Sequence, residues 1–350
     1  MPIINQVVKG SGGSAPAHYI EKSVDANGKL VNGSTVIDLT GVTDVGEGAL
    51  KYAYASNTNI SGLVDLSPLT TISGSNAFNS AFQYCTNITS VDLSSLISIT
   101  GGSYACRFMF QGCTKLVSVD MSSFENASGN NCCADMFNGC TKLENVYLGS
   151  LTTVSGSYAF ATAFVNTKLA NIDLSSLTTV SGDYAFNQTF QNCSLITSVS
   201  FDSLTSLTGT YAFNSMFQSC SGLTNISFYA LMPSSFGSHT NQFYRMLYWA
   251  TGCTVHFPMA IQSTIGSWSD VTNGFGGTNT TVLFDIVTSL TGADSNTYTR
   301  KQKESTGTAT AWTYNDTLYY TSGTTEPSVG DTIYSDSACT IAVTTISAIA

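Results

Sequence analysis

A row of acidic and aromatic residues recurs at one position along the sequence and is the first candidate for a binding surface. Its members are Asp65, Asp92, Asp120, Tyr147 and Asp173. Each follows Val or Ile in an alternating apolar–polar segment, so a strand would turn these side chains outward. Carboxylates on neighbouring strands about 5 Å apart repel one another unless a cation, a basic partner or water relieves them. Three interpretations therefore stay open: an acidic recognition stripe, a structural cation site, or a solubilising sheet edge.

A second candidate surface is a row of tyrosines that each precede an alanine in the return arm of the repeat. Its members are Tyr158, Tyr184 and Tyr211, with Tyr104 at the same position. A tyrosine offers a flat apolar ring and a hydroxyl group, a combination that suits sugars and protein surfaces. The alternative interpretation is a half-buried stack of rings that only seals one flank of the fold.

The sequence carries no recognisable catalytic constellation. It has only three histidines, and neither H-E-x-x-H nor G-x-S-x-G occurs. Five of the ten cysteines share one repeat position: Cys85, Cys113, Cys140, Cys193 and Cys220. Thiols at such a position are expected to be buried and inert, although neighbouring coils would bring them within reach of a disulfide. The sequence thus predicts a non-enzymatic protein with no catalytic residue and no cofactor, and it assigns no metal ligand beyond the open question of a cation at the acidic row.

These rows arise because one motif returns about every 27 residues. The segments NITSVDL, KLVSVDM, KLENVYL, KLANIDL, LITSVSF and GLTNISF end at residues 93, 121, 148, 174, 201 and 228. Leu39, Leu66, Phe257 and Phe284 extend the series to ten copies. A period of this length indicates stacked units that lean on their neighbours. The predicted fold class is a β-rich α/β solenoid of about ten coils with a parallel sheet.

Each coil is expected to return through an arm rich in phenylalanine. The rings recur four residues apart, as in Phe78/Phe82 and Phe186/Phe190, and this spacing puts both on one face of a helical turn. The sequence therefore predicts one short helical turn per coil and a buried column of rings. Cys106 and Asp135 are expected to replace the first ring in two coils, which would make residues 100–140 the weakest stretch.

The motif L-x-x-[IV]-x-L with a Phe-rich, Cys-bearing return arm, as in YAFNQTFQNCSLITSVSF, resembles the BspA-like leucine-rich repeats of bacterial and phage surface proteins. The resemblance covers residues 31–287. It implies a curved solenoid with a parallel sheet on one face and, in many members, an adhesive or ligand-binding role. Residues 1–30 are expected to hold an attachment segment, a Gly/Ser linker and a capping hairpin at Asn27-Gly28. Residues 288–350, which lack Phe, are expected to form a small all-β module.

The charge pattern narrows the partners. Charged residues make up 10% of the chain, the net charge is −10 and no basic stripe is evident, so nucleic acid is not an expected partner. No apolar stretch reaches about 18 residues, so no membrane insertion is expected.

The opening segment MPIINQVVKG is similar to the starts of tail-associated proteins of phages that infect gut bacteria, and it does not read as a signal peptide. The sequence therefore favours a virion component, a tail or fibre protein that binds protein or glycan on a bacterial surface. Other virion proteins would bind its N-terminal segment. The alternatives are an extracellular or cell-surface BspA-like adhesin and a purely structural spacer, and a homo-oligomer stays open.

Overall fold

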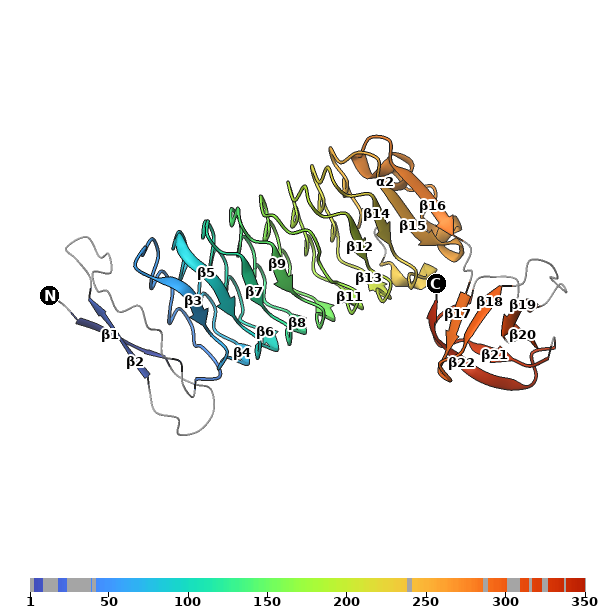
Figure 1. Cartoon of the computed structure of the whole chain (residues 1–350), viewed down its shortest axis with the longest axis horizontal. Helices are drawn as coiled ribbons and strands as arrows, with labels where there is room; N and C mark the ends of the chain where they lie inside the picture. The colour runs from blue at the N-terminus through green and yellow to red at the C-terminus, as the bar shows by residue number, and fades with distance from the viewer. Residues whose placement is uncertain are drawn as a thin grey trace.

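The protein is a long stack of coils that ends in a separate β module (Figure 1). The computed structural model describes residues 3–8, 18–23, 39, 42–237, 241–285, 289–300, 309–314, 317–322, 327–336 and 338–349. Near the N-terminus, β1 (Ile3–Val8) pairs antiparallel with β2 (His18–Ser23). The linker predicted between residues 10 and 14 and the hairpin predicted at Asn27-Gly28 lie outside the described residues.

One side of the stack is a parallel sheet, called here the first sheet, to which most coils contribute one strand. Its strands are β3 (Ser61–Asp65), β5 (Asn87–Asp92), β7 (Ser118–Asp120), β9 (Asn145–Tyr147), β12 (Ser198–Ser200), β14 (Asn225–Ser227), β15 (Thr254–Pro258) and β16 (Thr281–Asp285). Strands β3 to β9 form one continuous group and β12 to β16 another. The predicted solenoid and parallel sheet are confirmed, with about eight turns in place of the ten counted from the motif.

A second parallel sheet of two-residue strands runs along the neighbouring side of the stack without interruption. Its strands are β4 (Thr71–Ile72), β6 (Ser98–Ile99), β8 (Asn126–Ala127), β10 (Thr153–Val154), β11 (Thr179–Val180) and β13 (Ser206–Leu207). The second residue of each pair is buried, as at Ile72 and Val180. Each coil therefore contributes buried side chains from two separate segments, one in each sheet, before its return arm begins.

The return arm is a ladder of tight turns, so the predicted helical turn is wrong. The Ala81 N–H donates to the Phe78 carbonyl at 2.9 Å, three residues back, whereas the Phe82 N–H donates to Met109 in the next coil at 2.8 Å. Amides alternate in this way along every arm. Because each second N–H bonds to another coil, the four-residue bonding of an α-helix cannot form.

A positive φ at every fourth residue lets the arm alternate between these two bonding patterns. It occurs at Asn76, Ser80 and Tyr84, with φ of 55°, 55° and 60°. Such angles are uncommon outside glycine, asparagine and aspartate. The inward position of both predicted phenylalanines is nevertheless retained, since Phe78 and Phe82 are fully buried.

A column of aromatic rings runs through the core, as predicted. The second ring of each arm belongs to it: Tyr54, Phe82, Phe110, Phe137, Phe164, Phe190 and Phe217, with centroids 5.1–5.7 Å apart in the stacked pairs. Burial of each phenylalanine side chain contributes about 1.5–3 kcal/mol to folding. The column is therefore a leading source of stability.

The first ring of the arm is replaced by Leu50 in the first coil and by Cys106 and Cys133 later in the stack, and all three side chains are buried. Asp135 lies two residues beyond Cys133, so its predicted place in the ring column is wrong. Phe124 stands where neighbouring coils have leucine, and its ring meets Phe160 edge-on at 6.4 Å. The larger Phe124 side chain thus occupies core volume in a coil that has lost a ring.

The last coils are closed by short helices, and a β module follows. The helices are η1 (Pro233–Ser235), η2 (Met259–Ile261), α1 (Gln262–Ile265), α2 (Ser269–Thr272) and η3 (Gly274–Gly276). The module contains β17 (Ser289–Gly292), β18 (Thr297–Arg300), β19 (Ala309–Tyr314), β20 (Thr317–Ser322), β21 (Thr332–Tyr334) and β22 (Ala342–Ile349), which pair antiparallel into a closed ring. The all-β character of this module is confirmed, and the domain limits at residues 30 and 287 stay predictions.

Candidate binding surface

The acidic row lies on the outer face of the first sheet, and each carboxylate there caps a turn. Asp65 pairs in register with Asp92, and Asp92 with Asp120. The Ser67 backbone N–H and hydroxyl donate to Asp65 Oδ1 at 3.0 and 2.6 Å. Ser94 N–H donates to Asp92 Oδ1 at 2.9 Å in the same way. These bonds are local Asx turns that hold the chain as it leaves the strand.

The cation interpretation of the row gains no support from this geometry. Each row carboxylate accepts a hydrogen bond from its own coil, and hydrogen bonds from Ser67 lower the pKa of Asp65. Within the described part of the chain, no group of three or more His, Cys, Asp and Glu is placed to hold a metal ion.

At Tyr147 the row changes composition at two positions together. Tyr147 replaces the aspartate, and Gly149 replaces the serine that would donate to it. Gly149 keeps the backbone N–H that donates in the other turns, but it has no hydroxyl, and Tyr147 offers no carboxylate to accept either bond. A Cβ atom added to Gly149 would lie 2.9 Å from Asp173 Oδ2 in the next coil. Glycine therefore leaves room for the Asp173 carboxylate at this point.

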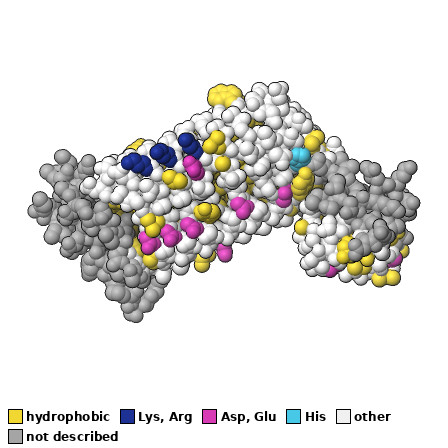
Figure 2. Space-filling view, viewed as in Figure 1, with side chains coloured by type: hydrophobic (Ala, Val, Ile, Leu, Met, Phe, Trp, Pro, Cys, Tyr) yellow, Lys and Arg dark blue, Asp and Glu magenta, His cyan; other side chains and the backbone are white. Residues whose placement is uncertain are grey.

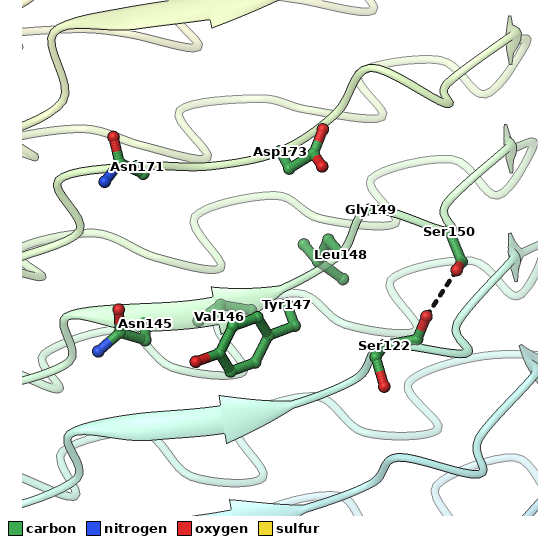
Figure 3. A pocket seen from close by; sticks show the side chains of 9 residues that line it. All are labelled: Ser122, Asn145, Val146, Tyr147, Leu148, Gly149, Ser150, Asn171 and Asp173. Atoms are coloured by element: carbon green, nitrogen blue, oxygen red, sulfur yellow. Dashed lines mark hydrogen bonds between the residues drawn. The ribbon is translucent and has the colours of Figure 1, made fainter.

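These substitutions border a shallow pocket of about 420 Å³. It is lined by Ser122, Asn145, Val146, Tyr147, Leu148, Gly149, Ser150, Asn171 and Asp173. Figure 3 shows Asn145 and Asn171 one above the other on successive turns, with Asp173 above Gly149. Tyr147 is 54% exposed, and its ring extends toward the side of Asn145 (Figure 3). The pocket thus combines an accessible ring with two amides and a carboxylate.

The pocket lies where the first sheet is interrupted. β9 pairs with β7, but among the described residues 168–174 no strand continues the sheet beyond it. This coil has 26 residues from Leu148 to Leu174, one fewer than the 27 from Met121 to Leu148. Ile172 and Leu174 remain buried, so the coil keeps its core contacts while its outer edge departs from the sheet.

The tyrosine row lies on another side of the coil, at the start of the turn ladder. The Tyr158 and Tyr184 rings stack at 4.9 Å, and those of Tyr184 and Tyr211 at 5.0 Å. Each of the three has a positive φ between 53° and 55°. The structure therefore brings Tyr147 and Asp173 together but leaves Tyr158, Tyr184 and Tyr211 apart from them. A stack of this kind fits the flank-sealing interpretation.

A row of lysines beside the first sheet, in the segments that lead into its outer face, was missed when charge was counted over the whole chain. Lys115, Lys142 and Lys168 each begin a repeat motif in three consecutive coils, and all three are exposed. Figure 2 shows the basic side chains as one row, with one acidic side chain beside it, and most of the other acidic side chains as a separate row on the same face. The recurring Lys-Leu pair in KLVSVDM, KLENVYL and KLANIDL was the available signal. The inference that no basic stripe exists is corrected.

The cysteine row is a buried ladder of free thiols. Cys140 Sγ donates to the Phe110 carbonyl at 3.1 Å, and Cys193 Sγ to the Phe164 carbonyl at the same distance. Burial raises the pKa of Cys140 to about 12 and that of Cys193 to about 11. The thiolate needed for nucleophilic chemistry is therefore disfavoured. Across the described ranges, no helix is both long and apolar enough to cross a membrane.

Of the comparisons with known proteins, the family profile agrees with this architecture. A structural likeness to the functional domain of InlJ from Listeria monocytogenes, described as including a cysteine ladder, has 13% identity and covers 89% of this chain and 86% of that one. Its TM-score is 0.11. No curated protein matches the chain. The profile of the BspA type leucine rich repeat region matches six copies over residues 51–189 and 161–244. The chain belongs to the BspA-type leucine-rich repeat family.

Proposed function

We propose that this chain is a non-enzymatic recognition protein that contacts a bacterial surface through the outer face of its first sheet. The observation that carries the proposal is the pocket at Tyr147. It interrupts an otherwise regular row with an accessible ring and polar groups. Repeats of this family suggest a protein-binding or adhesive role, which agrees with an exposed recognition face.

The finer proposal is that the chain belongs to a virion, as a tail or fibre component. The similarity of MPIINQVVKG to the starts of phage tail-associated proteins supports it. In this arrangement residues 1–30 bind other virion proteins, and the first sheet remains free for protein or glycan on the cell. Labelling with an antibody against this chain distinguishes the locations by electron microscopy. Label on virions supports the tail assignment, whereas label on the envelope of the producing bacterium supports a cell-surface adhesin.

Binding of the fluorescent full-length chain to bacterial cells tests the recognition surface. Tyr147→Ala removes the exposed ring, and we expect about thirtyfold weaker binding, the loss of about 2 kcal/mol typical of a central contact. Tyr52→Ala is the matched control, because Tyr52 is 57% exposed but lies on the turn ladder. Equal binding by both variants and the unmodified chain would show that the pocket is not the contact surface. Such a result would favour a structural spacer.

A further inference from the structure

We propose that the ligand of the first sheet is an acidic glycan several sugar units long, held by the row of Lys115, Lys142 and Lys168 and by the pocket beside Tyr147. This inference rests on the proposed recognition function and names the chemical class of its ligand. Two independent features carry it, the charge of the row and the chemistry of the pocket.

No ion pair within the described structure neutralises the lysine row, and Glu144 is the one acidic residue that precedes the row position in the three motifs that begin with these lysines. The described residues contain one ion pair, between Arg107 Nε and Asp135 Oδ2 at 3.5 Å, so none of the three lysines takes part in one. Lys115 Nζ donates to the neutral Asn87 side chain at 2.8 Å. Three of the six basic residues between positions 42 and 285 thus stand in one line. Like charges at the same position of adjacent coils repel, and a bound anion would relieve them.

The spacing of the row fits a polymer with repeated anionic groups. Neighbouring strands lie about 4.8 Å apart, which is close to the length of one sugar unit in an extended glycan. One lysine side chain per coil would then lie opposite about one acidic group per sugar unit. A small anion would instead need several charges that converge on one point.

The pocket supplies groups of the kind that bind sugar hydroxyls. Asn145 and Asn171 stand in adjacent coils, yet within the described part of the chain neither side chain has a hydrogen-bond partner. Elsewhere a stacked pair bonds directly, as when Asn192 Nδ2 donates to Asn166 Oδ1 at 2.9 Å. The amides in the pocket are therefore free to bind a ligand, and the Tyr147 ring offers the flat face on which a sugar can stack.

The acidic row limits where an anionic ligand can lie. Lys115 and Asp120 are five residues apart, and a fully extended chain of that length spans about 16 Å, which is the upper limit for the separation of the two rows. A duplex nucleic acid would meet Asp92 and Asp120, whereas a narrower glycan fits beside the lysines. Tyr147 is the one position among Asp65, Asp92, Asp120, Tyr147 and Asp173 that carries no charge. A sugar unit can therefore approach the strand ends at this gap.

An oligosaccharide array tests the proposal with the full-length chain. It contains uronate-, sialate- and sulfate-bearing oligosaccharides, each beside its carboxyl-reduced or desulfated counterpart, together with single-stranded and duplex oligonucleotides. We expect binding to acidic members and not to their neutral counterparts, and weaker binding at higher salt because surface charge is screened. The triple variant Lys115→Gln, Lys142→Gln, Lys168→Gln should bind about tenfold more weakly or worse. Lys51→Gln on the turn ladder is the matched control and should bind unchanged.

The outcomes separate this inference from the proposed function. Absence of binding to every acidic glycan, equal binding to the neutral counterparts, an unaffected triple variant, or tighter binding of an oligonucleotide would each overturn it. If the triple variant still binds cells and Tyr147→Ala does not, the proposed recognition surface is supported and the proposal of an acidic glycan as its ligand is rejected. If the unmodified chain binds neither cells nor glycans, both proposals fail. Thermal unfolding of the triple variant should match the unmodified chain, because all three lysines are exposed.

Discussion

The two halves of the first sheet share one interior and differ on their outer face. At the row position the N-terminal half has Asp65, Asp92 and Asp120, whereas the C-terminal half has Ser200 and Ser227. Inside, the ring column passes from one half to the other without a gap, with Phe137, Phe164 and Phe190 stacked at 5.5 and 5.4 Å. The repeat therefore constrains the residue types in the core. The outward-facing residues can differ between the halves, and they can form a ligand-binding surface.

The difference in charge is not required by the turns. In β12 the Asp202 N–H donates to Ser200 Oγ at 3.2 Å, in the place where Ser94 N–H donates to Asp92 Oδ1 at 2.9 Å. A hydroxyl can thus cap the turn as a carboxylate does. The negative charge of the N-terminal half is therefore an addition to the capping role.

The largest expected effect tests whether the interior is equivalent in both halves. Phe137→Ala and Phe190→Ala each remove a buried ring from the column, and we expect each to lower the free energy of unfolding by about 3–5 kcal/mol. Urea unfolding followed by circular dichroism measures the loss. A loss below about 1 kcal/mol in only one half would break the comparison, since that half would not depend on the shared column.

The thiol ladder provides a smaller test of the same equivalence. Cys140→Ala and Cys193→Ala each remove one of the two donors to a buried carbonyl and create a small cavity, so we expect each to cost about 1–2 kcal/mol. In the unmodified chain Cys339, which is partly exposed, should react first with a thiol reagent, and the other nine cysteines, all buried, only after unfolding. Early labelling of Cys140 but not Cys193 would show that the N-terminal half opens separately.

Replacing a row aspartate of the N-terminal half by the serine of the C-terminal half tests whether the turn needs a carboxylate. Asp120→Ser gives the N-terminal strand the residue of β12, and we expect a change in unfolding free energy of less than about 0.5 kcal/mol. Asp120→Ala removes the cap and should cost about 1 kcal/mol. Differential scanning calorimetry compares the two. If Asp120→Ser is as destabilising as Asp120→Ala, the turn requires the carboxylate itself.

The smallest expected effect concerns acid stability in the N-terminal half. Hydrogen bonds from Ser67 lower the pKa of Asp65 below its ordinary value of 3.8. Because the folded pKa is lowered, the stabilisation is present above that value and is lost as pH falls through the folded pKa. The stability difference between the unmodified chain and Asp65→Asn should therefore shrink between about pH 5 and about pH 2. A difference that is constant with pH would contradict this role of Ser67.

The interior was predictable because identical side chains recur at a fixed spacing, as with Phe82 and Phe110. The return arm was not, because phenylalanines four residues apart are equally consistent with a helix. A helix and a ladder of tight turns differ in whether every second amide bonds to the next coil. That bonding pattern leaves only a weak signal in the sequence, such as Gly112 and Gly139 at positions of positive φ.

The candidate site was predictable only in part. Tyr147 and Asp173 could be identified by register, but their shared pocket depends on the loss of strand pairing after β9. Strand pairing is lost in the 26-residue coil from Leu148 to Leu174, and the loss depends on the backbone path of that coil, which the sequence alone does not give. Gly149 gave no separate signal, because its role is to leave space for a carboxylate 24 residues later in the chain.

The interrupted coil also has a mechanical consequence. A tether bound at the pocket would pull on a coil that the second sheet and the turn ladder hold to its neighbours, while the first sheet does not. Under load the rupture of hydrogen bonds begins where fewest of them act in parallel. The coil between Leu148 and Leu174 is thus the place where force would first separate the stack, and the continuous ladders on the other two sides would limit how far the opening spreads.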